Sequence, residues 1–149
     1  MKKLAREWIA QGLIAIVVFF NLDAAFSFMF RPDLYAPGFE ISGIPGRAVT
    51  QGMGLLFLMW NVPYLFALVK PVKHFISLIE AVLMQAIGVF GETILLLNLP
   101  GSHPLITSTT QRFIIFDGGG LILLIIALII TRQIRLSRKT DLLPEQLKQ

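Results

Sequence analysis

Four long apolar stretches, separated by short polar connections, dominate the pattern of hydrophobic and polar positions along the chain. They cover about residues 8–30, 51–69, 75–99 and 113–131. A bilayer's hydrocarbon core is roughly 30 Å thick, so a spanning helix needs about 20 mostly apolar residues. None of the stretches alternates as a barrel strand does, and lipid offers the backbone no hydrogen-bond partner. The pattern predicts an all-α integral membrane four-helix bundle, with residues 1–149 in a single domain.

The first apolar stretch has two interpretations. Basic residues precede it and the small residues of "DAAFS" follow, as in a cleaved secretory signal. Its apolar character nevertheless continues through Phe26, Phe28 and Phe30, well beyond the roughly 7 to 15 residues of a signal core. We therefore expect a retained membrane helix, with the cleaved signal as the alternative.

The basic residues predict how the helices are oriented. Only Arg31, Arg47 and Arg112, of 13 lysines and arginines, lie in the connections that follow the first and third stretches. The others precede the first stretch, join the second to the third or follow the fourth. Since loops rich in lysine and arginine stay in the cytoplasm, we expect both termini to be cytoplasmic and the protein to be a multi-pass protein of the cell inner (plasma) membrane.

The connections differ in character. "RPDLYAPGFEISGIPGR", residues 31–47, holds three prolines and three glycines in 17 residues, which predicts a folded cap over the helix ends rather than a long helix. "KPVKH" allows only a tight turn, so the second and third helices should form an antiparallel hairpin. The basic cytoplasmic tail, residues 132–149, is expected either as an amphipathic helix on the inner membrane surface or as a solvated segment.

Composition and charge exclude several classes of function. Hydrophobic residues make up 55% of the chain and charged residues 15%, against about 25% charged in an ordinary soluble domain. The net charge of +4 sits in clusters that flank the apolar stretches, so we expect no nucleic-acid partner. There is no cysteine, and His74 and His103 lie on opposite predicted sides of the membrane. We therefore expect no haem, zinc or copper site, no metal and no cofactor.

Polar side chains at membrane depth are the candidate functional residues, because ionisable groups inside spans are costly and usually face the bundle interior. Asp23, Glu92 and Asp117 all fall in the predicted outer half of their helices. Arg47 and Arg112, with Gln51, fall at a similar depth. A metal site made of the three carboxylates alone is a minor alternative.

The spacing of the third stretch supports a shared pocket. Ala81, Gln85, Gly88 and Glu92 recur at intervals of four, three and four residues, which places them on one face of a helix. In the fourth stretch, "FDGGG" sets three glycines directly after the aspartate, so that a neighbouring backbone or a ligand can come close to the carboxylate.

The stretch "LMWNVPYLFAL", residues 58–68, places a proline and an asparagine near the bilayer centre. Pro63 lacks an amide donor and crowds the carbonyl four residues earlier, so the second helix should kink there. Asn61 can donate to a freed carbonyl or reach Gln85 of the third helix. Trp60 and Tyr64 would form an aromatic wall or reach the inner interface. We interpret the stretch as the floor of an outward-facing cavity.

Each of these groups also has a purely structural interpretation. Asp117 with Arg112, and Glu92 with Arg47, are candidates for ion pairs that fix helix packing. Asp23 could bond the outer loop instead of facing a cavity. The glycines of the fourth stretch are as well explained by helix packing as by a ligand.

The chain resembles the DoxX-like superfamily of small four-helix membrane proteins, nearest its BphX-like branch. The resemblance covers most of residues 8–131 and rests on the Pro/Gly-rich first outer loop, an "RA...GM...MWNVPY" second helix and a "Q..G..GE" third helix. The residues that carry it are Arg47, Ala48, Gly52, Met53, residues 59–64, Gln85, Gly88, Gly91 and Glu92. It implies a helical bundle, often encoded near oxidoreductases and sometimes tied to quinone-linked or sulfur metabolism. Members that act on thiols use cysteines, which this chain lacks.

These observations predict an accessory or ligand-binding protein, more readily than an enzyme, with an outer-leaflet polar cavity for a quinone- or lipid-like molecule. Three alternatives stay open. One is a proton-coupled transporter, which four helices would support only as a homo-oligomer. Another is an enzyme on a lipid-like substrate, for which the sequence nominates no nucleophile. The third is a packing subunit of a larger complex, for example with a membrane oxidoreductase.

Overall fold

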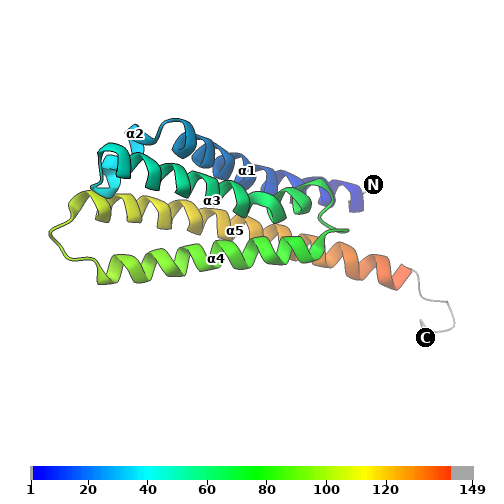
Figure 1. Cartoon of the computed structure of the whole chain (residues 1–149). Helices are drawn as coiled ribbons and strands as arrows, with labels where there is room; N and C mark the ends of the chain where they lie inside the picture. The colour runs from blue at the N-terminus through cyan, green and yellow to red at the C-terminus, as the bar shows by residue number, and fades with distance from the viewer. Residues whose placement is uncertain (1, 142–149) are drawn as a thin grey trace.

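The computed structural model describes residues 2–141, and this part of the chain is all-helical, with no strand. Four helices are long, and a short helix and a 3₁₀ turn connect the first two of them (Figure 1). The elements are α1 (Lys2–Phe30), α2 (Pro32–Tyr35), η1 (Ala36–Phe39), α3 (Gly43–Val69), α4 (Phe75–Asn98) and α5 (Pro104–Asp141).

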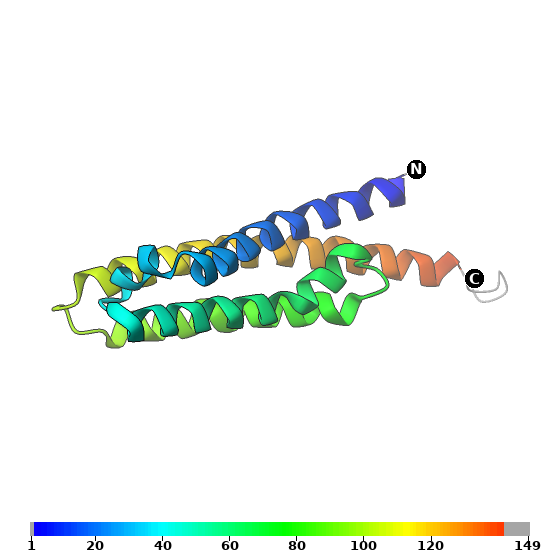
Figure 2. The same cartoon turned by 45° about the horizontal axis from the view of Figure 1, so that its top comes forward.

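The four long helices lie side by side as a square. Helix α1 packs against α3 and α5, and α4 packs against α5 and, more lightly, α3, whereas the backbones of the diagonal pairs lie farther apart. The start of α1, the α3–α4 turn and the end of α5 lie at one end of the bundle (Figures 1 and 2). The elements α2 and η1 lie at the opposite end. This arrangement agrees with the predicted hairpin of the second and third apolar stretches.

Two helices begin earlier than the apolar pattern predicts. Helix α3 starts at Gly43 rather than at 51, and α5 starts at Pro104 rather than at 113. The first-turn amides of a helix have no partner inside it, so Pro104 at the first position and Pro45 at the third are tolerated. Residues 43–50 and 104–112 are therefore helix, where the sequence predicted loop.

The last helix also ends later than predicted. Helix α5 runs unbroken to Asp141, so the basic segment after 131 continues the fourth span instead of forming a separate surface helix. Residues 142–149, the remainder of the predicted tail, lie outside the described part of the chain.

The burial pattern is that of a membrane bundle. Four helices, Leu4–Phe30, Gly43–Val69, Phe75–Asn98 and Pro104–Arg138, are long and apolar enough to cross a membrane, which indicates a multi-pass membrane protein. Many leucine, isoleucine and phenylalanine side chains face outward, whereas alanines and threonines are fully buried between the helices. Burying a leucine between helices gains little when the alternative is lipid, which is equally apolar. Membrane helices are therefore held together largely by close contacts between small residues.

Gly54 sets the close approach of α1 and α3. A Cβ atom at this position would lie 2.7 Å from the carbonyl oxygen of Ala25 and 2.8 Å from the backbone nitrogen of Met29. Both atoms belong to the backbone of α1 and cannot rotate away. The absence of a side chain on Gly54 is therefore a condition for the α1–α3 contact.

Contacts between η1 and α5 fasten the end of the bundle that holds α2 and η1. From the predicted orientation we call this end the outer end and the opposite one the inner end. The Thr109 hydroxyl donates to the Gly38 carbonyl at 2.9 Å, and His103 Nδ1 lies 2.6 Å from Glu40 Oε2. Glu40 ends η1 in the left-handed conformation, with φ of 57°. The side-chain hydrogen bond with His103 lowers the pKa of Glu40 below its ordinary value. The predicted folded cap is thus present, over residues 31–42.

The inner end is fastened by the first and last helices. Gln11 donates to the carbonyls of Leu68 and Val69, which joins α1 to the end of α3. Arg138 Nη2 lies 2.8 Å from Glu7 Oε2, which joins α5 to α1. These contacts hold the start of α1 and the last turns of α5 at the same end of the bundle.

Candidate functional site

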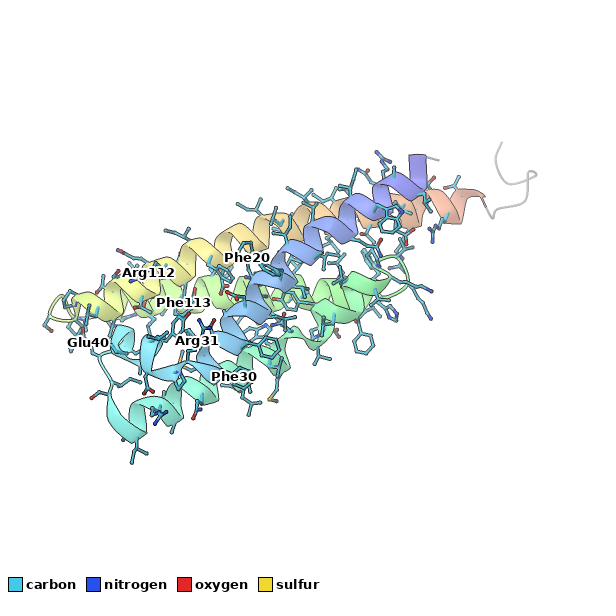
Figure 3. All side chains as sticks on the ribbon, turned by 90° about the horizontal axis from the view of Figure 1, so that it is seen from above. Phe20, Phe30, Arg31, Glu40, Arg112 and Phe113 are labelled. Atoms are coloured by element: carbon cyan, nitrogen blue, oxygen red, sulfur yellow. The ribbon has the colours of Figure 1, made fainter. Side chains whose placement is uncertain are left out.

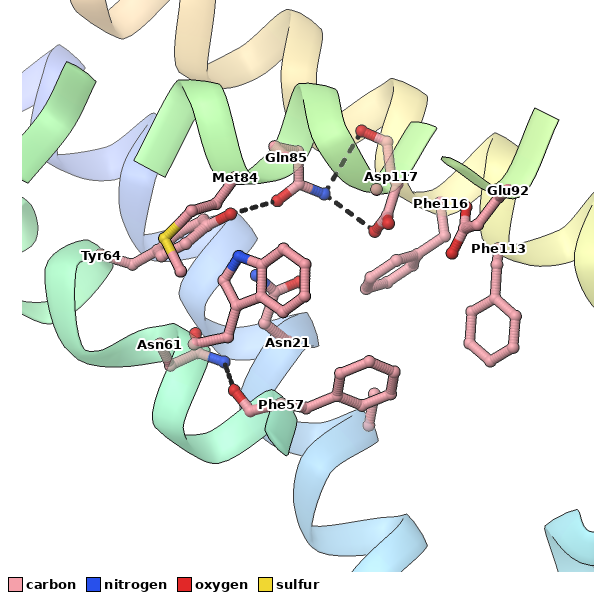
Figure 4. A pocket seen from close by; sticks show the side chains of 13 residues that line it. Asn21, Phe57, Asn61, Tyr64, Met84, Gln85, Glu92, Phe113, Phe116 and Asp117 are labelled. Atoms are coloured by element: carbon pink, nitrogen blue, oxygen red, sulfur yellow. Dashed lines mark hydrogen bonds between the residues drawn. The ribbon is translucent and has the colours of Figure 1, made fainter. Parts of the chain in front are cut away.

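A polar cavity of about 100 Å³ lies between all four long helices, in the half of the bundle nearer to α2 and η1 (Figure 4). Two of its lining residues come from α1, four from α3, four from α4 and three from α5. They are Asn21, Ala24, Phe57, Trp60, Asn61, Tyr64, Met84, Gln85, Gly88, Glu92, Phe113, Phe116 and Asp117. Polar groups from all four long helices therefore meet in one space inside an apolar bundle.

A chain of hydrogen bonds crosses the cavity from α3 to α5. The Tyr64 hydroxyl donates to Gln85 Oε1 at 2.7 Å, and Gln85 Nε2 donates to Asp117 Oδ1 at 2.9 Å and to the Asp117 carbonyl at 3.3 Å (Figure 4). Tyr64 and Gln85 are almost fully buried. The chain uses both amide hydrogens of Gln85 and holds Asp117 on one wall of the cavity.

Two glycines make room for this chain. A Cβ atom on Gly88 would lie 2.6 Å from Asp117 Oδ2, and one on Gly120 would lie 2.9 Å from Gln85 Nε2. Gly88, Gln85 and Glu92 share one face of α4, as their spacing predicts. Of the three glycines that follow Asp117, only Gly120 is closely approached. A Cβ on either of the other two would meet no atom within 4 Å.

Asn61 lies on the cavity floor with one polar atom unused. It is 2% exposed, and its Nδ2 donates to the Phe57 carbonyl at 2.8 Å, four residues earlier. This carbonyl is not the predicted one freed by Pro63, which is that of Met59. Asn61 also forms no hydrogen bond with Gln85, the other predicted partner, whose side-chain oxygen accepts from Tyr64. Its own Oδ1 is buried without a hydrogen-bond partner. Helix α3 continues through Pro63 without a break.

Glu92 is the second residue with an unused acceptor. Its Oε2 is buried without a partner, and its carboxyl group faces the same space as that of Asp117 (Figure 4). Among the described residues, no lysine or arginine forms an ion pair with either carboxyl group. The cavity thus contains two acidic groups and no cation.

Aromatic rings pack together at the end of the cavity nearer to η1. Phe57 and Phe113, which line it, pack at 5.6 Å and 6.1 Å between ring centroids on Phe28, which also contacts Phe39 of η1. Phe39 and Phe113 stack at 6.1 Å. We call Phe28, Phe39, Phe57 and Phe113 the aromatic roof. These four rings come from α1, η1, α3 and α5 and pack together at one end of the cavity.

Two of the three predicted carboxylates meet in the cavity, and the third does not. Asp23 is exposed on the outside of α1, and nothing in the described part of the chain pairs with it. Its neighbour Asn21 lines the cavity instead. Asp23 makes no hydrogen bond to the outer loop within the described residues.

The predicted cations and Gln51 also lie outside the cavity. Arg47 Nε is 3.2 Å from Asp33 Oδ1, so it joins α3 to α2 rather than pairing with Glu92. Arg112 donates to Ser108 at 3.3 Å and is exposed, so it does not pair with Asp117. Figure 3 shows Arg112 with Arg31 and Glu40 at the outer end of the bundle. Gln51 is exposed and donates to the carbonyl of Met29.

The aromatic lining was missed in the sequence. Phe57, Phe113 and Phe116 occur among many other apolar residues, and nothing in their spacing separates a cavity wall from a lipid-facing side chain. Asn21 carried a usable signal, since an amide in the middle of an apolar stretch is seldom left facing lipid.

Comparisons with known proteins add no family. No protein-family model matches the chain, and neither a curated protein nor a solved structure matches it. Within the described residues there is also no group of three or more histidine, cysteine, aspartate or glutamate side chains placed to hold a metal ion. The function must be argued from the cavity itself.

Proposed function

We propose that the protein binds the polar head of an amphipathic membrane molecule, quinone- or lipid-like, in the cavity between its four helices. The single observation that supports this most is the pair of buried acceptors without a partner, Asn61 Oδ1 and Glu92 Oε2, on residues that line one cavity. Its role would be that of a ligand-binding or accessory membrane protein.

The energetics of buried polar groups support the proposal. A buried acceptor without a hydrogen bond costs about 1–3 kcal/mol, and in lipid no water is at hand to satisfy it. Removing the carboxyl group would avoid this cost without affecting the alanine and glycine contacts that hold the helices together. Groups of this kind in a span are usually retained because a substrate or ion uses them.

We further propose that both termini are cytoplasmic, which places the cavity in the outer leaflet of the cell inner membrane. The N-terminus, Lys70, Lys73 and the basic end of α5 lie at one end of the bundle, and this is the charge distribution of a cytoplasmic face. The chain has no cysteine, so single cysteines report the orientation. A membrane-impermeant maleimide added to intact cells should label Ser102→Cys and not Val72→Cys, and the reverse pattern would invert the topology.

Membership of the DoxX-like superfamily stays a proposal, supported by the residue pattern of the second and third apolar stretches and by no family match. Such membership is compatible with a ligand-binding role and with an accessory role. The cavity therefore carries the functional conclusion independently of the resemblance.

The test is mass spectrometry of the protein gently extracted from its native membrane. We expect a bound small amphiphile in the wild-type protein that is lost in a Glu92→Gln, Asp117→Asn double variant. Glu80→Gln is the matched control, because Glu80 is an exposed carboxylate on the same helix, outside the cavity. Equal retention in wild type and double variant would contradict the proposal. An empty protein with a stoichiometric protein partner would indicate a packing subunit.

A further inference from the structure

A groove on the outside of the bundle adjoins the cavity. It lies between α1 and α5, has a volume of about 350 Å³, and is lined mainly by apolar side chains and by Gly119 and Gly120. It shares Asn21 and Phe116 with the cavity. Phe116 is 36% exposed and meets Phe20 edge-to-face at 6.1 Å. The Phe116 ring therefore stands between the polar cavity and the lipid-facing groove.

The two buried side-chain atoms of the cavity that lack a partner are both acceptors, Asn61 Oδ1 and Glu92 Oε2. Asn61 donates one amide hydrogen to the Phe57 carbonyl, and Gln85 donates to Asp117. Asp117 accepts one side-chain hydrogen bond and has a second carboxylate oxygen. The complementary head group for these two acceptors is one that donates hydrogen bonds, whereas a quinone only accepts them and would leave both acceptors without a partner.

The acidic groups and the aromatic rings of the cavity further restrict the chemistry of the head group. Two carboxyl groups share the cavity without a basic side chain among the described residues, and burying such charges is costly unless a cation pairs with them. Trp60, Phe57 and Phe116 line the same space (Figure 4), and aromatic faces attract organic cations by about 0.5–2 kcal/mol each. Acidic groups and aromatic walls together match an ammonium group.

The dimensions agree with a small head and a long chain. The cavity of about 100 Å³ is smaller than the roughly 150 Å³ that accommodates a benzene ring, so a substituted quinone ring would not fit without rearrangement. An ammonium group is smaller than a ring. The groove beside it, with its apolar lining and open side, matches an alkyl chain.

We propose that the ligand of this protein is a single-chain amphiphile with a protonated amine head, which lies between Glu92, Asp117 and Asn61 while the chain leaves through the α1–α5 groove over Gly119. This proposal rests on the proposed function and specifies its ligand. The ammonium hydrogens supply the donors that the orphaned acceptors lack.

Tryptophan fluorescence allows a direct test in lipid nanodiscs of zwitterionic composition. Trp60 lines the cavity, and Trp8, the other tryptophan, is 68% exposed. In a Trp8→Phe background the signal reports on the cavity alone. Decylammonium should produce a saturable change in fluorescence. Its affinity should be at least about tenfold higher than that of decanol, which corresponds to about 1.4 kcal/mol of binding free energy. Glu92→Gln should remove this preference, and Glu80→Gln should keep it.

The groove is tested separately by filling it. A Cβ at Gly119 or at Gly118 meets no atom within 4 Å, but only Gly119 lines the groove. Gly119→Leu should lower the ratio of decylammonium to butylammonium affinity by about tenfold or more, a loss of the size expected for a few displaced methylenes. Gly118→Leu should leave this ratio unchanged.

The outcomes separate the ligand class from the proposed function. Equal affinity for decylammonium and decanol, measured in the Trp8→Phe background alone, would overturn the amine head and leave the cavity as a binding site. An unchanged chain-length ratio in Gly119→Leu would overturn the groove. No saturable response to any amphiphile, together with no molecule retained in the native extract, would overturn both proposals.

Discussion

The substitution Gly88→Ala tests whether Asp117 is held where the structure places it. The new Cβ atom would lie 2.6 Å from Asp117 Oδ2, well inside the 3.4 Å at which ordinary van der Waals contact begins. The carboxylate must therefore move by several tenths of an ångström. Because Asp117 Oδ1 accepts from Gln85 at 2.9 Å, this movement lengthens or breaks the hydrogen bond.

The expected cost follows from two opposing contributions. Loss of a hydrogen bond to a charged group costs about 1.5–3 kcal/mol, whereas replacing glycine by alanine inside a helix gains up to about 1 kcal/mol. Gly91→Ala, three residues further along α4, gains the same helix propensity and meets no atom within 4 Å. The free energy of unfolding of Gly88→Ala should therefore lie about 1–3 kcal/mol below that of Gly91→Ala.

The measurement is reversible unfolding in mixed micelles, followed by far-ultraviolet circular dichroism, for both single variants and for each combined with Asp117→Ala. With the carboxylate removed, Gly88→Ala and Gly91→Ala should have similar effects, because the coupling between neighbours disappears when one partner is absent. Equal stability of the two alanine variants in the wild-type background would refute the placement of Asp117 against Gly88.

Three further predictions concern other contacts. Gly54→Ala should lower the free energy of unfolding by about 1–3 kcal/mol, because its Cβ meets the backbone of α1; Gly52→Ala, which meets nothing within 4 Å, should be neutral or stabilising in the same assay. Tyr64→Phe should cost about 1–3 kcal/mol, because it leaves a buried acceptor on α4 without its donor; an unchanged denaturation midpoint would argue against that hydrogen bond. Since the pKa of Glu40 is lowered in the folded protein, its contact with His103 should stabilise the outer cap at neutral pH and lose this effect as the pH falls below about 4.5. Hydrogen exchange of residues 36–42, corrected for the intrinsic rate, should show less protection in acid for the wild type and no such loss for Glu40→Gln.

The spacing of polar residues within a helix predicted the α4 wall of the cavity. Gln85, Gly88 and Glu92 meet the cavity because a face of an α-helix is fixed by sequence intervals alone. The four apolar helices were predicted for a similar reason, since length and composition decide what can span a bilayer.

The contacts of the charged side chains were not predicted, because they depend on where each helix begins and how it is rotated. Arg112 and Asp117 lie on the same helix five positions apart, about 140° around its axis at about 100° per residue, so they face different directions. Because the fourth helix was predicted to start at residue 113, Arg112 was placed in the loop before it, and this difference in direction was not recognised. For Asp23, α1 is apolar on most sides, and the one signal of the side that faces the bundle was Asn21, two positions away and so about 160° around the axis.

The aromatic roof has a consequence for how occupancy of the cavity should be expressed. A site that lies beneath these rings and is reached through the α1–α5 groove, as we propose, equilibrates with molecules already dissolved in the bilayer. Its occupancy then depends on the mole fraction of amphiphile among the lipids, and adding lipid at a constant total amount of amphiphile would empty the site. An amphiphile that partitions strongly would saturate even a weak site at low bulk concentration.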